Sequence, residues 1–313
     1  MIRCEEHMLL LHMFVETGRL RRQKGFIVMW SADTTQNTYL IDIEEGAETA
    51  RLIEQDILFN RAQGGLFPEG LDLSQMENVL DLGCGPGGWA LEVAYTYKHL
   101  GVIGVDVNPN MMRYAFAEAR TRGLENISFE VMDVRQPLEF QEASFDLINA
   151  RFIAGFMDRA SWPLLLLECL RLLKPGGIIR LTEMETSSSS SASLDRLNGY
   201  LYQALQQQKR SFSVNGRSIG VAYMLGKLLQ DAGFQKIRRF PFINDSSHGA
   251  ELHYSTTKDI EVLYPLIKPY LINSGIVDEP TFDAEYKTML IDMLGTDYVS
   301  LGFGLIVVAQ KGA

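Results

Sequence analysis

The 313-residue sequence predicts an α/β fold built on a mostly parallel sheet. Short apolar runs alternate with helical patterns from about residue 76 to 184, which is typical of βαβ units with helices on both faces of a sheet. A glycine-crowded turn joins the first run to a helix, and a β-branched run at 301–310 supplies a strand near the end of the chain. These observations together predict a doubly wound sheet with added helical segments.

The central elements follow from local signals, taken in chain order. Strands are expected at five apolar runs: 79–82, 102–106, 127–132, 145–149 and 177–181. Helices are expected at 89–97, 108–122 and 163–173. In the second helix Asn108 is a suitable N-cap and Pro109 a suitable first residue. Gly123 ends that helix, because glycine adopts the left-handed conformation without steric cost.

The flanking regions give weaker signals. Further helices are expected at 8–15, 47–59 and 218–232, and a further strand at 234–242. Residues 243–298 look mostly helical, and the five serines 187–191 predict a flexible surface linker. We therefore expect three regions: an N-terminal helical segment at 1–70, a ligand-binding core at 71–185, and lid insertions with the closing strands at 186–313.

The composition narrows the possible partners. A net charge of −10 and a pI near 5.1 disfavour nucleic acids, whose phosphates bind positive surfaces. Cys4, Cys84 and Cys169 have neither metal-ligand nor disulfide-framework spacing, which fits a reducing compartment. No apolar run reaches the roughly 18 residues of a membrane helix, and the acidic start is unlike a secretory signal. We therefore expect a cytoplasmic protein without a nucleic-acid, membrane or metal partner.

The turn Gly83-Cys84-Gly85-Pro86-Gly87-Gly88 matches G-x-G-x-x-G, a pattern that several ligands share. A P-loop requires Lys-Ser or Lys-Thr after the last glycine, whereas Trp89 follows here. A nicotinamide dinucleotide fits the spacing, with Asp106 as the acid at the end of the second strand. Asp81 disfavours it, because a carboxylate beside the turn repels a pyrophosphate and suits a ligand with an ammonium group.

S-adenosylmethionine carries such an ammonium group, and the sequence offers a partner for its other parts. Asp106 can accept hydrogen bonds from both ribose hydroxyls. Asp133, just after the third strand, can accept from the adenine amino group. Asn149, Ala150 and Arg151 end the fourth strand, at the edge where open α/β sheets bind ligands.

Five motifs in this order resemble the class I S-adenosylmethionine-dependent methyltransferases. They are the D-x-G-x-G-x-G turn, the acid after the second strand, the acid after the third strand, SFDLI and LRLLKPGG. The resemblance covers about 75–185, and the run at 301–310 matches the antiparallel seventh strand of that family. It implies a Rossmann-like, seven-stranded sheet and S-adenosylmethionine as cofactor. It also implies cofactor contacts at Asp81, Gly83, Cys84, Gly85, Asp106, Val107, Met111, Met132, Asp133, Val134, Asn149, Ala150 and Arg151, where Cys84 is a small turn residue and not a nucleophile.

The region before the core is similar to the N-terminal segment of small-molecule methyltransferases of quinone and natural-product biosynthesis. The similarity lies in YLID, ETARLIEQD and GGLFP. It implies a helix that covers the cofactor, with Tyr39, Arg51 and Gln55 near the sulfonium or the methionine carboxylate. In the alternative, Tyr39 is a packing aromatic and Arg51 pairs with Glu48 or Gln55 at the surface. An exchange of this segment between subunits would give a homo-oligomer.

The chemistry expected from this resemblance is in-line methyl transfer, for which the protein aligns the reactants and excludes water. A general base is needed only where the acceptor must lose a proton, and the candidates are Glu183, Glu185, His248 and His253. Aromatic residues in 1–60, 186–216 and 243–298 predict a lid over an apolar pocket. The sequence therefore favours a small, largely apolar metabolite as acceptor, with oxygen, nitrogen and carbon all open.

Three alternatives stay open at this point. A protein of this fold can bind S-adenosylmethionine and catalyse a non-methylating reaction such as cyclisation. A nicotinamide-dependent oxidoreductase is disfavoured by Asp81. A protein methyltransferase would need a more open groove than these lid segments suggest.

Overall fold

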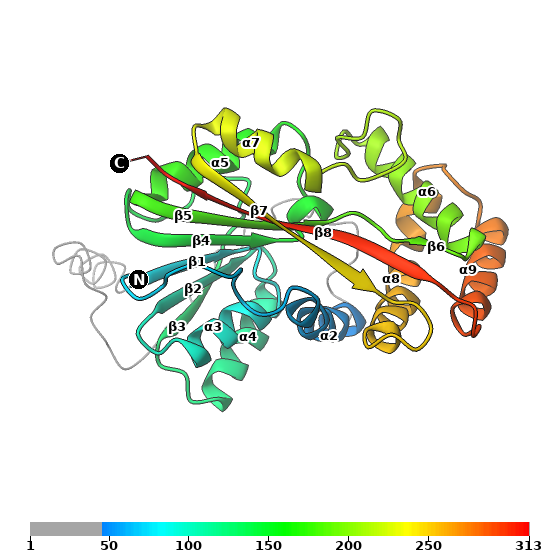
Figure 1. Ribbon diagram of the computed structural model, residues 1–313, viewed down its shortest axis with the longest axis horizontal. Coiled ribbons are helices and arrows are strands. Elements are labelled where there is room, and N and C mark those ends of the chain that lie inside the picture. Colours follow the sequence, from blue (N-terminus) through cyan, green and yellow to red (C-terminus); the bar gives the residue numbers. More distant parts are fainter. Residues whose placement is uncertain (1–45, 313) are drawn as a thin grey trace, which may run out of the picture. The chain divides into compact units, whose positions relative to one another are not determined.

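A computed structural model describes residues 46–312, and its centre is a single twisted sheet (Figure 1). The strands lie in the order β3-β2-β1-β4-β5-β8-β6. β7 stands outside this path and also pairs with β8. Their bounds are β1 Asn78–Leu82, β2 Gly101–Asp106, β3 Ile127–Val131, β4 Phe145–Arg151, β5 Leu173–Met184, β6 Ser188–Ser189, β7 Gln235–Asp245 and β8 Ser300–Gln310. The pairs from β3 through β5 are all parallel, whereas β8 is antiparallel to β5, β6 and β7.

This topology confirms the predicted α/β class with a mostly parallel, Rossmann-like sheet. The seven expected strands are present, and β6 is a further two-residue strand. The described helices are α2 Gly46–Ala62, α3 Gly88–Thr96, α4 Pro109–Thr121, α5 Ser161–Leu172, α6 Ala192–Gln207, α7 Leu225–Ala232, α8 His253–Asn273 and α9 Glu279–Met293. The predicted caps of α4 are also confirmed, since the Asn108 side chain accepts from the Asn110 N–H at 2.9 Å and Gly123 has a φ of +64°.

Two expectations for local structure are wrong. The serine run 187–191 is not a free linker, because Ser188 pairs with Leu301 in the sheet and Ser191 caps α6 by accepting from the Leu194 N–H at 3.1 Å. Residues 218–221 are not helical, and α7 is preceded only by a short 3-10 turn at Ala222–Met224. The pairing of Ser188 with Leu301 and the hydrogen bond from the Gly220 N–H to Glu185 join segments that are distant in sequence, and local propensity does not contain such partners.

The helices of the predicted lid regions form a hydrophobic cluster of their own. α6, α8 and α9 bury Leu197, Tyr264 and Phe282 against one another. Figure 1 shows these helices grouped at the end of the sheet where β5 runs on into β6, which is the carboxyl end of the parallel strands. α8 also packs against α2. The added helices therefore stand beside the edge of the sheet where ligands bind in this class of fold.

Several predictions concern residues outside the described range. These are the helix at 8–15, the position of Tyr39 and the environment of Cys4. The homo-oligomer through the N-terminal segment and the cytoplasmic location stay predictions as well. Among residues 46–312, no helix combines the length and the apolar character that crossing a bilayer requires.

The glycines of the fold give a first expected result for stability. Gly199 lies in the middle of α6, and a Cβ there would have no atom within 4 Å, so Gly199→Ala should stabilise the fold by about 0.5–1 kcal/mol. Gly104 lies in β2, where a Cβ would come within 2.7 Å of the Phe129 side chain, so Gly104→Ala should destabilise it. Urea unfolding of the two variants measures both effects. Opposite signs are expected, and a destabilising Gly199→Ala would contradict the open environment of that site.

Candidate functional site

The glycine turn follows β1 and exposes its backbone to a cavity. Gly83, Gly85 and Gly87 have φ values of +63°, +54° and +84°, a region that side chains disfavour. A Cβ at Gly87 would also lie 2.9 Å from the Phe129 ring. The sequence needs glycine here for backbone conformation and for close packing of α3 against the sheet.

Asp106, at the end of β2, fixes the turn. Its Oδ2 accepts from the Gly85 N–H at 3.0 Å, and its Oδ1 accepts from the Asn108 N–H at 2.9 Å. One carboxylate thus joins the turn after β1 to the start of α4. Burial raises the pKa of Asp106, while the backbone N–H groups oppose that shift.

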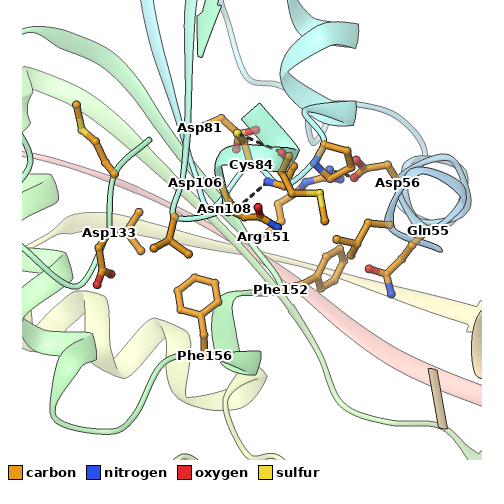
Figure 2. Close-up of a pocket in the computed structure, with 18 of the residues that line it drawn as sticks. Gln55, Asp56, Asp81, Cys84, Asp106, Asn108, Asp133, Arg151, Phe152 and Phe156 are labelled. Carbon is orange, nitrogen blue, oxygen red and sulfur yellow. Dashed lines mark hydrogen bonds and ion pairs between the residues drawn. The ribbon is translucent and has the colours of Figure 1, made fainter. Parts of the chain in front are cut away.

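The first cavity has a volume of about 130 Å³ and lies over this turn (Figure 2). Figure 2 shows Asp133 at one end of the cavity and Gln55 at the other. The residues predicted from the sequence that line it are Gln55, Asp81, Gly83, Cys84, Gly85, Asp106, Val107, Met111, Met132, Asp133, Val134 and Arg151. The structure therefore brings most of the predicted cofactor residues around one space.

Asn149 and Ala150 do not line this cavity. Asn149 is fully buried behind it, where its Nδ2 donates to Asp81 Oδ1 at 2.7 Å and its Oδ1 accepts from Arg180 Nη1 at 2.6 Å. Ala150 belongs to the hydrophobic core. In place of direct contact, Asn149 holds the Asp81 carboxylate, and Arg180 fixes which way the Asn149 amide points.

Arg51 also lies elsewhere. Its guanidinium donates to Glu48 at 2.7 and 2.9 Å and to Asp259 Oδ1 on α8 at 2.8 Å, and it lines a second cavity. The pairing with Glu48 that the alternative interpretation proposed is present, but it is buried and not at the surface. The pair with Asp259 fastens α2 to α8.

Asp56, Asp81 and Arg151 are three ionisable groups that line the first cavity. Burial raises the pKa of Asp81 to about 7, against the opposing effects of Arg151 and of the hydrogen bond from Asn149. Burial also raises the pKa of Asp56, which forms an ion pair with Arg151. Two carboxyls and one guanidinium in a desolvated space complement a ligand that carries both an ammonium and a carboxylate group.

Sequence reasoning missed Leu52, Asp56, Phe152 and Phe156, which also line the first cavity. Leu52 and Asp56 are four positions apart and therefore lie on the same face of α2, the helix expected to cover the cofactor, and this spacing was the signal for Asp56. Phe152 has a φ of +56°, a strained value for an aromatic residue. Such strain is a feature of the backbone and is invisible in the sequence.

Asp56 also occupies the start of α3. Its carboxylate accepts from the Gly88 backbone, and a Cβ at Gly88 would overlap it. A dinucleotide needs this helix N-terminus for its pyrophosphate. With a carboxylate on the helix N-terminus and Asp81 nearby, the turn does not offer a pyrophosphate site.

A second cavity of about 250 Å³ adjoins the first, and Gln55 and Phe152 line both. Glu183, at the end of β5, is buried in its wall, and its Oε1 accepts from the Ala154 N–H at 3.0 Å. Burial raises the pKa of Glu183 to about 8, although the N–H groups of Ala154 and Ile153 oppose the shift. A buried carboxyl that titrates near neutral pH is suited to exchange a proton with a ligand.

Neither of the two candidate histidines is among the residues that line the two cavities. His248 is exposed, and His253 begins α8, where its Nδ1 forms a hydrogen bond with the Ser246 carbonyl oxygen at 2.9 Å. The His253 ring lies against Tyr298, with the ring centroids 5.9 Å apart. The structure gives His253 a packing position at the junction of β7 and α8, and a role of either histidine as general base stays a prediction.

Comparison with known proteins agrees with this geometry. A family model described as a methyltransferase domain matches residues 79–177. Phosphoethanolamine N-methyltransferase 1 of Triticum aestivum is 31% identical over 172 residues, 55% of this chain and 31% of the relative. Methyltransferase str2 of Strobilurus tenacellus is 26% identical over 171 residues, 54% of this chain and 57% of the relative. Demethylmenaquinone methyltransferase of Lactococcus lactis is 33% identical over 111 residues, 35% of this chain and 42% of the relative.

The chain therefore spans between about a third and somewhat more than half of the length of these relatives. The matched residues 79–177 contain β1 except for its first residue, all of β2 through β4, and the glycine turn. They also contain Asp81 within β1, Asp106 at the end of β2 and Asp133 after β3. This region is the part of the chain that matches the methyltransferase domain described by the family model.

Proposed function

We propose that this chain transfers a methyl group from S-adenosylmethionine to a small, largely apolar acceptor. The observation that carries the proposal is the adjacency of the two cavities, one rich in acids and the other largely apolar, which share Gln55 and Phe152 in their walls. Group transfer between two small molecules requires that they be held side by side. The match of the core to methyltransferases supports the choice of cofactor.

The first cavity fits the parts of this cofactor by the chemistry of its walls. Asp81, a buried carboxyl with a raised pKa, would receive the ammonium group. Arg151, whose one carboxylate partner among the described residues is Asp56, would receive the carboxylate. Asp106 would accept from the ribose hydroxyls. Met132 and Asp133 would border the adenine at the other end, where Arg135 Nη2 donates to Asp133 at 2.7 Å and orients it.

The residues of the second cavity would align the acceptor and exclude water. When bound, S-adenosylmethionine supplies an electrophilic methyl group on its sulfonium sulfur, and loss of this methyl group converts the sulfonium into a neutral thioether. Glu183 is positioned to take a proton from an acceptor that must lose one, and it belongs to β5, a central strand of the sheet. A base on a strand of the sheet is held more rigidly than one on a loop.

Calorimetric titration with S-adenosylmethionine, S-adenosylhomocysteine and NADH tests the cofactor. We expect binding of S-adenosylmethionine and S-adenosylhomocysteine but not of NADH. The affinity should be at least about tenfold weaker in Asp106→Ala, because that variant loses the ribose acceptor and the link between the glycine turn and the start of α4. Asp231→Ala, on the exposed face of α7, is the matched control and should bind like the wild type. NADH binding without S-adenosylmethionine binding would overturn the proposal.

The same preparations separate methyl transfer from other chemistry in this fold. Incubation with S-adenosylmethionine and a panel of small apolar acceptors should release S-adenosylhomocysteine together with a product heavier by one methylene. Conversion of an acceptor without release of S-adenosylhomocysteine would favour a non-methylating reaction such as cyclisation.

A further inference from the structure

We propose that the second cavity selects an uncharged, hydroxyl-bearing aromatic or alicyclic molecule and rejects acceptors that carry a phosphate or carboxylate group. This inference rests on the proposed function, since it names the class of acceptor for the same site. It comes from the charges and partners of the residues that line the cavity.

The walls of the second cavity are largely hydrocarbon. Phe59 and Phe152 stand together on one side, with ring centroids 4.6 Å apart. Leu201, Ile260 and Leu263 contribute apolar surface from α6 and α8. An apolar ring system would bury its surface here, at a gain of about 25 cal/mol for each Å² removed from water.

The one cationic side chain among the lining residues that the structure describes is Arg51. It is buried and already bound to two carboxylates, at 2.7 and 2.9 Å to Glu48 and at 2.8 Å to Asp259. A phosphate or carboxylate on the acceptor would thus enter a desolvated space whose positive charge is already neutralised. Burying an unpaired charge is costly, so the cavity discriminates against anions.

The three acidic side chains of the cavity differ in their partners. Asp259 is bound to Arg51 and lies 3.4 Å from the Gln55 amide. Glu185 accepts from the backbone N–H groups of Gly220 at 2.9 Å and Ala222 at 3.2 Å, which ties down the segment before α7. Glu183 has no cationic partner among the described residues and is held by the Ala154 N–H. Glu183 is therefore the carboxyl in this wall best placed to meet a polar group of the acceptor.

A hydroxyl group on the acceptor is a better hydrogen-bond partner for the Glu183 carboxyl than an ammonium group is. A neutral hydroxyl donates one hydrogen bond and adds no charge to a dry cavity, whereas an ammonium ion must be desolvated. In the reaction the hydroxyl proton would pass to a Glu183 carboxylate oxygen, and an oxygen lone pair would form the new bond to the methyl carbon. The bond between that carbon and the sulfonium sulfur would break, and its electron pair would stay on sulfur in S-adenosylhomocysteine. The shared walls at Gln55 and Phe152 place that end of the second cavity beside the first.

Three probes with one apolar body test the inference: 2-naphthol, 2-naphthyl phosphate and protonated 2-naphthylmethylamine. Each is titrated at pH 7 into the protein saturated with S-adenosylhomocysteine, so the readout is binding and not turnover. The naphthol should bind at least about tenfold more tightly than either charged probe. Leu263→Trp, which fills the cavity, should weaken naphthol binding, whereas Ile291→Trp on the exposed face of α9 should not.

Each other outcome overturns the inference. Equal or tighter binding of the phosphate would show that anions are accepted, and tighter binding of the amine would place a cation in the cavity. No naphthol binding, or binding that Leu263→Trp leaves unchanged, would exclude the cavity as its site. Titration of S-adenosylhomocysteine alone reports separately on the proposed function, because that ligand depends on the first cavity.

A second variant tests the role of the neutralised cation. Asp259→Asn removes one of the carboxylates bound to Arg51 and leaves the apolar walls unchanged. Binding of 2-naphthyl phosphate should then strengthen about tenfold while that of 2-naphthol stays within about twofold, because Arg51 regains the capacity for a charge-assisted hydrogen bond to the phosphate. Unchanged phosphate binding would refute the argument that the neutralisation of Arg51 excludes anions.

Discussion

Glu183→Gln is expected to lower the rate of methyl transfer to 2-naphthol by about 10²–10⁴-fold, the usual range for loss of a general base. The amide keeps an oxygen for the Ala154 N–H but cannot take a proton. In the wild type, the rate should rise with pH through about 8, because burial raises the pKa of Glu183 to about 8 and only its ionised form accepts the proton. Release of S-adenosylhomocysteine at a series of pH values measures both effects.

The stability of the same variant gives a readout that does not depend on the acceptor. The pKa of Glu183 is higher in the folded protein, about 8, than the ordinary value of 4.5, so the folded state holds the proton more tightly. Its contribution to stability is therefore full at low pH and is lost as the pH rises from about 4.5 through 8. Relative to the wild type, Glu183→Gln should gain about 2–4 kcal/mol of unfolding free energy between pH 5 and pH 9.

Urea unfolding at the two pH values provides the measurement. Glu142→Gln, at an exposed loop position before β4, is the matched control and should show no such pH-dependent gain. A gain in stability without loss of transfer would mean that Glu183 is a buried structural carboxyl. Loss of transfer with an unchanged pH profile would mean that it positions the acceptor without taking its proton.

Asp81→Asn is expected to weaken S-adenosylmethionine binding by about 10–100-fold, since it removes the buried carboxylate proposed to meet the ammonium group. Burial raises the pKa of Asp81 to about 7. Wild-type affinity should therefore increase from pH 6 to pH 8 as Asp81 loses its proton, and this increase should be absent in Asp81→Asn. Calorimetry across that pH interval measures both the loss of affinity and the loss of its pH dependence.

Asp72→Asn, at a fully exposed carboxyl, is the control for Asp81→Asn. It should leave both the affinity and its pH dependence unchanged. If Asp81→Asn bound the cofactor as tightly as the wild type, the ammonium group would lie elsewhere. Asp56, another buried carboxyl that lines the first cavity, would then be the next residue to replace.

The sequence was sufficient to predict the parts of the fold whose signal lies within a short stretch of neighbouring residues. The apolar runs for β1, β2 and β4, the caps of α4 and the glycine turn each carry their information within a few neighbouring residues. The parallel topology places the carboxyl ends of the strands along one edge of the sheet. Asp81, Asp106 and Asp133 could therefore be assigned to one site from the sequence alone, and all three line the first cavity.

What depended on contacts between distant segments could not be predicted in this way. The position of Arg51 is decided by Asp259, which lies 208 residues further along the chain. The same holds for β6, whose two serines pair with the start of β8. Local propensity contains neither partner, so the sequence left Arg51 open and assigned the serines to a linker.

The sequence by itself thus determined the sheet, the turn and the acids at the carboxyl ends of its strands, because βαβ geometry fixes where the end of each strand lies. Only the tertiary structure decided the second cavity, the neutralised state of Arg51 and the lack of a cationic partner for Glu183 within residues 46–312. The physical reason is that the burial and the charge pairing of these side chains arise from contacts between α2, β5, α6 and α8. That space exists only after these distant elements have packed together.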